Sequence, residues 1–78
     1  MKQVTIYTTP TCSYCKLSKE FFEKNGIAYT EHNVATDLEK RKEMIEKSGQ
    51  MGVPVILIDE EMVVGFDKAR LASLLGVA

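Results

Sequence analysis

The sequence predicts a single α/β domain with the element order β-α-β-α-β-β-α. Three observations lead to this prediction: β-branched and apolar runs alternate with stretches of helical periodicity, glycines and capping residues separate them, and 78 residues suffice for one hydrophobic core. Because a strand-helix-strand crossover has a fixed handedness, its helix should cover one face of a small mixed sheet. We therefore expect residues 1–78 to form one domain with four strands and three flanking helices.

The first strand and the first helix are predicted between residues 4 and 25. Val4–Thr8 is β-branched and aromatic, and Pro10 closes it, which is typical of a strand followed by a short loop. In residues 13–25 the apolar side chains fall on one helical face, and Asn25-Gly26 is a stop signal. The side chains expected to be buried from this helix are Leu17, Phe21 and Phe22.

The second strand and the second helix are predicted between residues 27 and 49. Residues 27–34 are typical of a more polar strand. Thr36 lies three places before Glu39, which is a capping-box signature for a helix that runs to Ser48 and stops at Gly49. The side chains expected to be buried from this helix are Leu38, Met44 and Ile45.

The remaining residues predict a hairpin and a last helix. Residues 53–58 form a continuous apolar run, and residues 62–64 follow after an acidic turn. Proline is excluded from the centre of a strand, so Pro54 should open the strand at a bend, for which a cis peptide bond is one means. Asp67 is placed to cap a helix that ends near Gly76. The leucines expected to form its buried stripe are Leu71, Leu74 and Leu75.

Composition and charge exclude two classes of function. Ten Lys and Arg residues against eleven Asp and Glu residues leave a formal net charge of -1, unlike the one-sided basic surface of a nucleic-acid binder. No apolar run approaches the roughly 20 residues that span a bilayer, and the N-terminus enters a strand-like segment instead of a signal peptide. We therefore expect a cytoplasmic protein that binds neither nucleic acid nor membrane.

Cys12 and Cys15 are the predicted catalytic pair. Two cysteines are too few for a disulfide framework, and their spacing suits redox chemistry in a reducing compartment. Cys12 falls where the first strand ends and the first helix begins, so unpaired backbone N–H groups and the helix dipole favour its thiolate. Cys15 lies one helical turn further on, within reach of a disulfide but without that acidifying position. We predict that Cys12 attacks a target disulfide and that Cys15 or an external thiol resolves the mixed disulfide.

A zinc site and a structural disulfide are the alternatives for this pair. With His32 the cysteines supply three N or S ligands where structural zinc usually has four, so we predict no metal site. His32 itself is expected to be a strand or surface residue. A structural disulfide stays open, although a short loop in a reducing compartment favours a labile one. Tyr14 either forms an apolar wall beside the substrate or packs against the protein.

The segments around the cysteines resemble the glutaredoxin family. The likeness covers the whole chain and is carried by Ile6-Tyr7-Thr8, Cys12-Ser13-Tyr14-Cys15, Gly52-Val53-Pro54 and Val64-Gly65-Phe66-Asp67. It implies a thioredoxin fold in which Pro54 is cis and faces the cysteines. It also implies a glutathione-dependent oxidoreductase that reduces protein disulfides and glutathione mixed disulfides.

The resemblance further implies a glutathione site. The backbone of Val53 would pair with the substrate, Arg41 and the start of the last helix would hold the carboxylates, and Asp67 would take the γ-glutamyl ammonium while also capping its helix. The implied binding residues are Tyr14, Arg41, Val53, Pro54, Gly65, Phe66 and Asp67. The implied partners of this monomer are glutathione, as reductant and co-substrate, and disulfide-containing or glutathionylated proteins, with no tightly bound cofactor.

Two departures from the family pattern leave alternatives open. The lysine usual three places before the first cysteine is Thr9, and the threonine usual before Val-Pro is Gly52. Gly65-Phe66-Asp67 is also similar to the tail of NrdH-type redoxins, which take electrons from thioredoxin reductase and serve ribonucleotide reductase. A third alternative, from Ser13 after the first cysteine, is a glutathione-ligated [2Fe-2S] cluster bridging two protomers.

Overall fold

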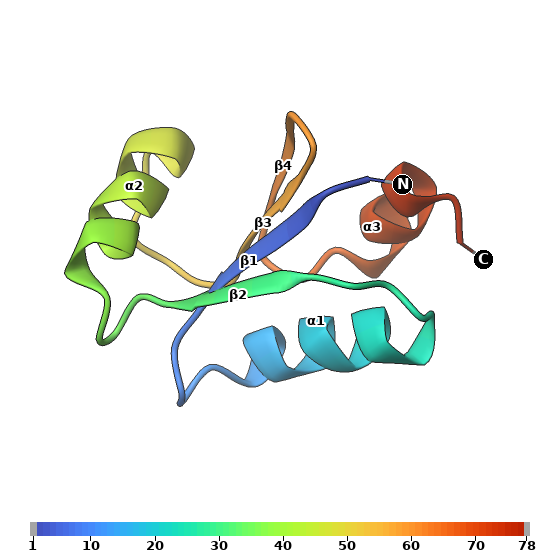
Figure 1. Cartoon of the computed structure of the whole chain (residues 1–78), viewed down its shortest axis with the longest axis horizontal. Helices are drawn as coiled ribbons and strands as arrows, with labels where there is room; N and C mark the ends of the chain where they lie inside the picture. The colour runs from blue at the N-terminus through green and yellow to red at the C-terminus, as the bar shows by residue number, and fades with distance from the viewer. Residues whose placement is uncertain (1, 78) are drawn as a thin grey trace.

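The computed structural model describes residues 2–77, and within them the element order is the predicted one. The sheet has the strand order β2-β1-β3-β4, with β1 parallel to β2 and antiparallel to β3, and with β3 antiparallel to β4 (Figure 1). The prediction of a four-stranded mixed sheet with three helices is confirmed. The elements are β1 (Val4–Thr8), α1 (Ser13–Lys24), β2 (Thr30–Asn33), α2 (Leu38–Ser48), β3 (Val55–Ile58), β4 (Glu61–Val64) and α3 (Lys68–Leu75).

The sheet separates two apolar clusters, with α1 and α3 on one face and α2 on the other (Figure 1). Because successive strand residues face opposite sides, Ile6 packs beneath α1 and α3 while Tyr7 packs beneath α2. The larger cluster consists of Val4, Ile6, Phe21, Phe22, Ile56, Ile58, Val63 and Leu71. The smaller one consists of Tyr7, Val34, Met44 and Val55. β1 and β3 are therefore the strands covered on both faces, as the apolar run of β3 predicted.

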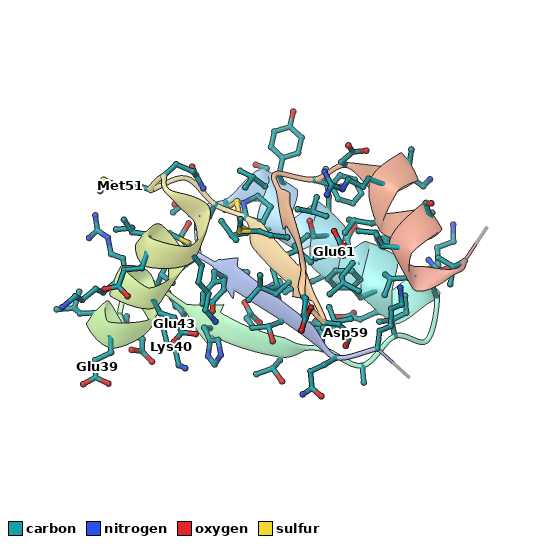
Figure 2. The ribbon with its side chains drawn as sticks, turned by 90° about the horizontal axis from the view of Figure 1, so that it is seen from above. Glu39, Lys40, Glu43, Met51, Asp59 and Glu61 are labelled. Atoms are coloured by element: carbon teal, nitrogen blue, oxygen red, sulfur yellow. A yellow bond between two sulfur atoms is a disulfide. The ribbon has the colours of Figure 1, made fainter. Side chains whose placement is uncertain are left out.

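A polar network ties α2 to the sheet. The hydroxyl of Tyr7, buried under α2, donates to Glu43 Oε1 at 2.9 Å. Lys47 bonds the same oxygen at 3.0 Å. Lys40 lies beside Glu43 and bonds its Oε2 at 3.1 Å (Figure 2). Glu43 thus satisfies a buried hydroxyl that would otherwise lose its hydrogen bond.

The ends of α2 and α3 follow the predicted signals in three places of four. Asp67 caps α3 through its carboxylate, and Gly49 and Gly76 take left-handed angles (φ 71° and 70°) after the last turns. The start of α2 is the exception, because the cap is Asp37 and not Thr36. A carboxylate accepts hydrogen bonds from the first helix N–H groups more strongly than a hydroxyl does. Asp37 Oδ1 therefore accepts the hydrogen bond from the backbone N–H of residue 40, at 3.1 Å.

Two leucines that the periodicity assigned to buried faces are exposed. Leu17 is 43% exposed, because the inner face of α1 is set by Cys15, Ser18 and Phe22, and Leu17 is rotated about 100° from Ser18. Ser18 can occupy that apolar face since its hydroxyl donates to the Tyr14 carbonyl at 2.8 Å. The prediction for Leu38 is wrong as well, because this first residue of α2 is 70% exposed and Met44 alone in the helix is fully buried.

β2 and β3 are shorter than the segments predicted for them, residues 27–34 and 53–58. β2 begins at Thr30, although Val34 beyond its end is buried and donates its backbone N–H to the Thr8 carbonyl at 2.9 Å. β3 begins at Val55, so Pro54 stands before the strand, as predicted, and the Val53-Pro54 peptide bond is cis.

Within residues 2–77 no helix has the length and apolar character of a membrane span.

Candidate active site

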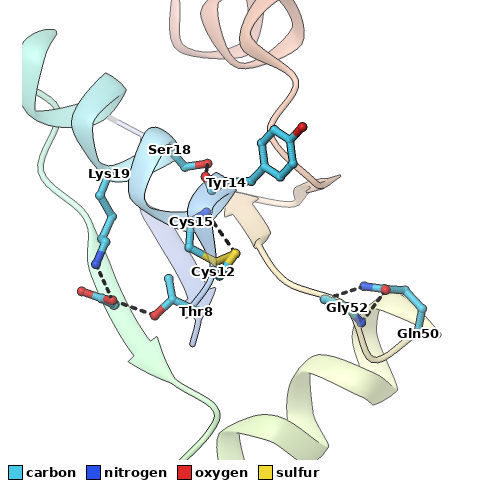
Figure 3. The surroundings of a disulfide bond; sticks show 9 residues. Thr8, Cys12, Tyr14, Cys15, Ser18, Lys19, Gln50 and Gly52 are labelled. Carbon is cyan, nitrogen blue, oxygen red and sulfur yellow. Dashed lines mark hydrogen bonds and ion pairs between the residues drawn. A yellow bond between two sulfur atoms is a disulfide. The ribbon is translucent and has the colours of Figure 1, made fainter. Parts of the chain in front are cut away.

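The two cysteines lie at the amino end of α1, directly after β1. Cys12 is the N-cap residue, with an extended backbone (φ -88°, ψ 110°), and its Sγ accepts the backbone N–H of Cys15 at 3.1 Å. The two residues form a disulfide, with their Cα atoms 5.2 Å apart (Figure 3). The structure therefore places Cys12 at the helix start that the spacing predicted.

Burial makes the two sulfurs unequal. Cys12 is partly exposed, whereas Cys15 is 1% exposed on the inner face of α1. After reduction, the same Cys15 N–H and the helix dipole would stabilise a thiolate at Cys12. An incoming disulfide can thus reach Cys12, while Cys15 is placed to attack only a disulfide already formed with Cys12.

The start of β3 faces the same end of the sheet as the cysteines. Tyr7 pairs with Val55 in the antiparallel ladder, so the end of β1 that leads to Cys12 lies beside the buried Pro54. The Pro54 carbonyl accepts the backbone N–H of Gly65 at 2.8 Å, which joins the end of β4 to this point. Among residues 2–77 the backbone N–H and C=O of Val53 have no hydrogen-bond partner. The fold thus presents unpaired main-chain groups near the disulfide.

Phe66 and Asp67 connect this region to α3. Phe66 is half-buried and packs edge-on against Phe21 of α1, with ring centroids 6.2 Å apart. Asp67 is exposed, and its Oδ1 accepts the backbone N–H of Arg70 at 3.2 Å. The β4-α3 connection therefore lies against the helix that carries the cysteines.

Tyr14 and Arg41 stand apart from these residues. Tyr14 is 62% exposed, and its ring extends away from the disulfide (Figure 3). The alternative expected for this residue, packing against the protein, therefore involves a minor part of its surface at most. Arg41 is exposed on α2, across the sheet from α1, and the ion pairs of that helix join Lys40 and Lys47 to Glu43 without it.

A pocket of about 330 Å³ opens beside the disulfide on the side of β2. The Glu31 carboxylate in its wall accepts the buried Thr8 hydroxyl at 2.7 Å and pairs with Lys19 at 3.0 Å (Figure 3). The Thr8 hydrogen bond, and after it the bond and charge of Lys19, hold the pKa of Glu31 below its usual range. The pocket is lined by Thr8, Thr9, Pro10, Cys12, Cys15, Lys16, Lys19, Glu31 and Asn33.

Sequence reasoning did not connect Thr8, Lys19 and Glu31 with the cysteines. Thr8 lies on β1, Lys19 on α1 and Glu31 on β2. Glu31 comes close to the end of β1 only through the parallel register of β1 and β2, in which it lies opposite Ile6. The sequence signal for this contact was Thr8, a polar residue at the end of the apolar strand β1. In the part of the chain that the structure describes, no group of three or more His, Cys, Asp and Glu side chains could hold a metal ion.

The chain is similar to proteins of one family. The glutaredoxin family profile matches residues 4–63. A glutaredoxin-like 8.6 kDa protein encoded in a rubredoxin operon of Clostridium pasteurianum is 46% identical over 72 residues, covering 92% of this chain and 96% of the relative. Glutaredoxin 3 of Escherichia coli K12 is 39% identical over 67 residues, which cover 86% of this chain and 81% of the relative.

Two further likenesses concern NrdH proteins and the fold. The glutaredoxin-like protein NrdH of Lactococcus lactis is 34% identical over 74 residues, covering 91% of this chain and 97% of the relative. The crystal structure of a mutant of the thioredoxin-like protein BC3987 superimposes with a TM-score of 0.92 at 33% identity, covering all of both chains. The fold is therefore thioredoxin-like. With the family profile over most of its length and a disulfide at the expected place, the chain belongs to the glutaredoxin family, as a thiol–disulfide oxidoreductase whose active pair is Cys12 and Cys15.

Proposed function

We propose that this chain is a glutathione-dependent oxidoreductase that reduces protein disulfides and glutathione mixed disulfides in the cytoplasm. It acts as a monomer with residues 1–78 as its single domain. The observation that supports this proposal best is that the partly exposed Cys12 and the unpaired backbone groups of Val53 lie at the same end of the sheet. An extended cysteinyl segment such as glutathione can pair with those groups while its sulfur meets Cys12.

The reaction proceeds by two thiol–disulfide exchanges. The Cys12 thiolate attacks the glutathione sulfur of a mixed disulfide in line, forms a new disulfide with it and releases the target thiolate. A second glutathione then attacks the glutathione sulfur of that bond, which frees the Cys12 thiolate and leaves glutathione disulfide as the product. When Cys15 attacks Cys12 Sγ instead, the first glutathione leaves as a thiolate and the Cys12–Cys15 disulfide forms. Two further glutathione molecules then reduce that disulfide and leave as glutathione disulfide.

The proposal also assigns groups of this chain to the charged ends of glutathione. We assign its carboxylates to the first N–H groups of α3 and to the exposed guanidinium of Arg41, which belongs to α2 on the other face of the sheet. Asp67 uses only Oδ1 for its cap within the described residues, so Oδ2 remains to accept the γ-glutamyl ammonium. Tyr14 and Phe66 flank the bound peptide, and Gly65 fixes the Pro54 carbonyl behind it.

The adduct of glutathione with the Cys15→Ser variant tests this placement. We expect the backbone amide signals of Arg41, Val53, Phe66 and Asp67 to shift when glutathione is attached to Cys12. The β-mercaptoethanol adduct is the matched control, since it has a sulfur but no peptide. If both adducts shift only the neighbours of Cys12, glutathione has no site here and the proposal is wrong.

An NrdH-type redoxin is the second candidate function. Thr9 removes a charge that would hold a glutathione carboxylate, and the Lactococcus relative is named NrdH. In that case thioredoxin reductase supplies the electrons and ribonucleotide reductase receives them. The chemistry at Cys12 and Cys15 is the same in both candidates.

A further inference from the structure

Gln50 forms two hydrogen bonds to one residue of the loop before Pro54. Its Oε1 accepts the backbone N–H of Gly52 at 2.6 Å, and its Nε2 donates to the Gly52 carbonyl at 3.0 Å (Figure 3). One side-chain amide thus occupies both main-chain groups of Gly52. A neighbouring strand would pair with them in the same way.

The Gln50 carboxamide occupies the space that a side chain at position 52 would need. A Cβ added at Gly52 would meet Gln50 Oε1 at 2.7 Å, closer than such atoms approach in proteins. A side chain at position 52 would therefore displace the carboxamide of Gln50. The two hydrogen bonds from Gln50 therefore go together with the absence of a side chain at Gly52.

The backbone of Gln50 is anchored at the end of α2. The Ser48 hydroxyl lies 2.7 Å from the Met44 carbonyl of that helix and 2.9 Å from the Gln50 carbonyl. It also accepts the Gln50 backbone N–H at 3.4 Å. The end of α2 therefore fixes the position of Gln50, and Gln50 in turn bonds Gly52.

We propose that Gln50 is a positioning residue for disulfide exchange. By pairing with Gly52 it orders the loop and leaves Val53, the next residue, as the place where substrate main chain can pair. This inference rests on the proposed pairing of substrate with Val53. Without the carboxamide, residues 51–53 would sample several conformations, and binding would have to order them.

A single-turnover experiment tests the proposal independently of the physiological reductant. Prereduced protein reacts with a short cysteinyl peptide joined by a disulfide to a chromogenic aromatic thiol. We expect Gln50→Ala to raise the half-saturating peptide concentration about fivefold, as for the loss of ordinary hydrogen bonds, with the limiting rate unchanged. The rate with a symmetric aromatic disulfide, which has no peptide group, should stay at the wild-type value.

Two further variants complete the design. Gln50→Glu keeps an acceptor for the Gly52 N–H but turns a carboxylate oxygen toward the Gly52 carbonyl, so its effect should be at least as large. It also serves where the alanine variant loses its fold. Gln3→Ala, at the opposite end of β1 from the cysteines, is the matched control and should leave every value unchanged.

Amide hydrogen exchange of Gly52 reports on the loop alone. We expect its N–H to exchange about fivefold faster in Gln50→Ala, with the melting temperature little changed. An unchanged exchange rate would overturn the role of Gln50. If the Gly52 N–H exchanges faster in Gln50→Ala but the half-saturating peptide concentration stays the same, the proposed effect of Gln50 on substrate binding is wrong. If instead a peptide N-methylated beside its cysteine saturates wild type equally well, it is the proposed pairing at Val53 that fails.

Discussion

At the scale of single residues, one hydrogen bond separates the roles of the two cysteines. The Cys15 N–H points at Cys12 Sγ, so the helix start stabilises negative charge on the exposed sulfur and not on the buried one. The same arrangement keeps Cys15 from meeting a large substrate. Nucleophile and resolving thiol are therefore assigned by position alone.

Serine variants of the two cysteines should consequently differ. We expect Cys12→Ser to abolish every disulfide exchange, and Cys15→Ser to keep reduction of a glutathione mixed disulfide, because a second glutathione replaces the resolving thiol. Turnover of a glutathionylated peptide measures the second activity, and reduction of an intramolecular protein disulfide measures the dithiol reaction. Equal loss of peptide turnover in both variants would contradict the assignment.

The proposed glutathione site makes a second prediction at this scale. Exposed ion pairs contribute about 0.2 to 1 kcal/mol, so Arg41→Ala should raise the KM for a glutathione mixed disulfide by a factor of about 1.4 to 5, and Thr9→Lys should lower it by a similar factor. Lys42→Ala is the control, being an exposed cation on the same helix. High salt should reduce both effects. If the Arg41→Ala and Lys42→Ala variants have the same KM, Arg41 does not bind glutathione and is an ordinary exposed residue of α2.

At the scale of elements, α2 is attached to the sheet by a carboxylate as well as by apolar packing. The hydrogen bonds from Lys47, Lys40 and Tyr7 lower the pKa of Glu43 to about 2. Burial, with the hydrogen bond to Glu43 adding to it, raises the pKa of Tyr7 to about 12. The charged carboxylate and the neutral phenol are thus the stable pair at neutral pH.

Acid should weaken this attachment. Because the folded-state pKa of Glu43 lies below its unfolded value near 4.5, its contribution is full above that value and is lost as pH falls toward about 2. Glu43 is about a third exposed, so we expect about 1 kcal/mol or less. Urea unfolding between pH 6 and pH 2.5 should show a smaller loss of stability in Glu43→Gln than in wild type. Parallel pH profiles for the two proteins would contradict this.

The elements themselves were largely predictable from local signals. Strand patterns and the caps at Asp67, Gly49 and Gly76 depend on short-range chemistry, and the structure confirms them. Leu17 and Leu38 were placed wrongly because hydrophobicity alone does not reveal which helical face the sheet covers. Burial of a side chain is a tertiary property, and a satisfied hydroxyl can take the inner position.

At the scale of the whole molecule, the topology assembles the site from separate segments. The antiparallel pairing of β1 with β3 brings the loop after β1 to the loop before β3, and the Gly65 bond adds the start of α3. The motif and its family likeness predicted which segments meet. They did not predict Gln50 or the pocket wall at Glu31, because those contacts depend on side-chain geometry between residues with no shared motif.

The central claim is that electrons reach Cys12 from glutathione, and the most direct test is a comparison of two coupled assays. NADPH consumption is followed with the purified protein and a disulfide substrate, once with glutathione and glutathione reductase, and once with thioredoxin reductase alone. We expect turnover in the glutathione assay, lost in Cys12→Ser and kept in Cys15→Ser for a glutathionylated peptide. No turnover with glutathione, together with ready turnover driven by thioredoxin reductase, would contradict the claim and establish the NrdH-type function.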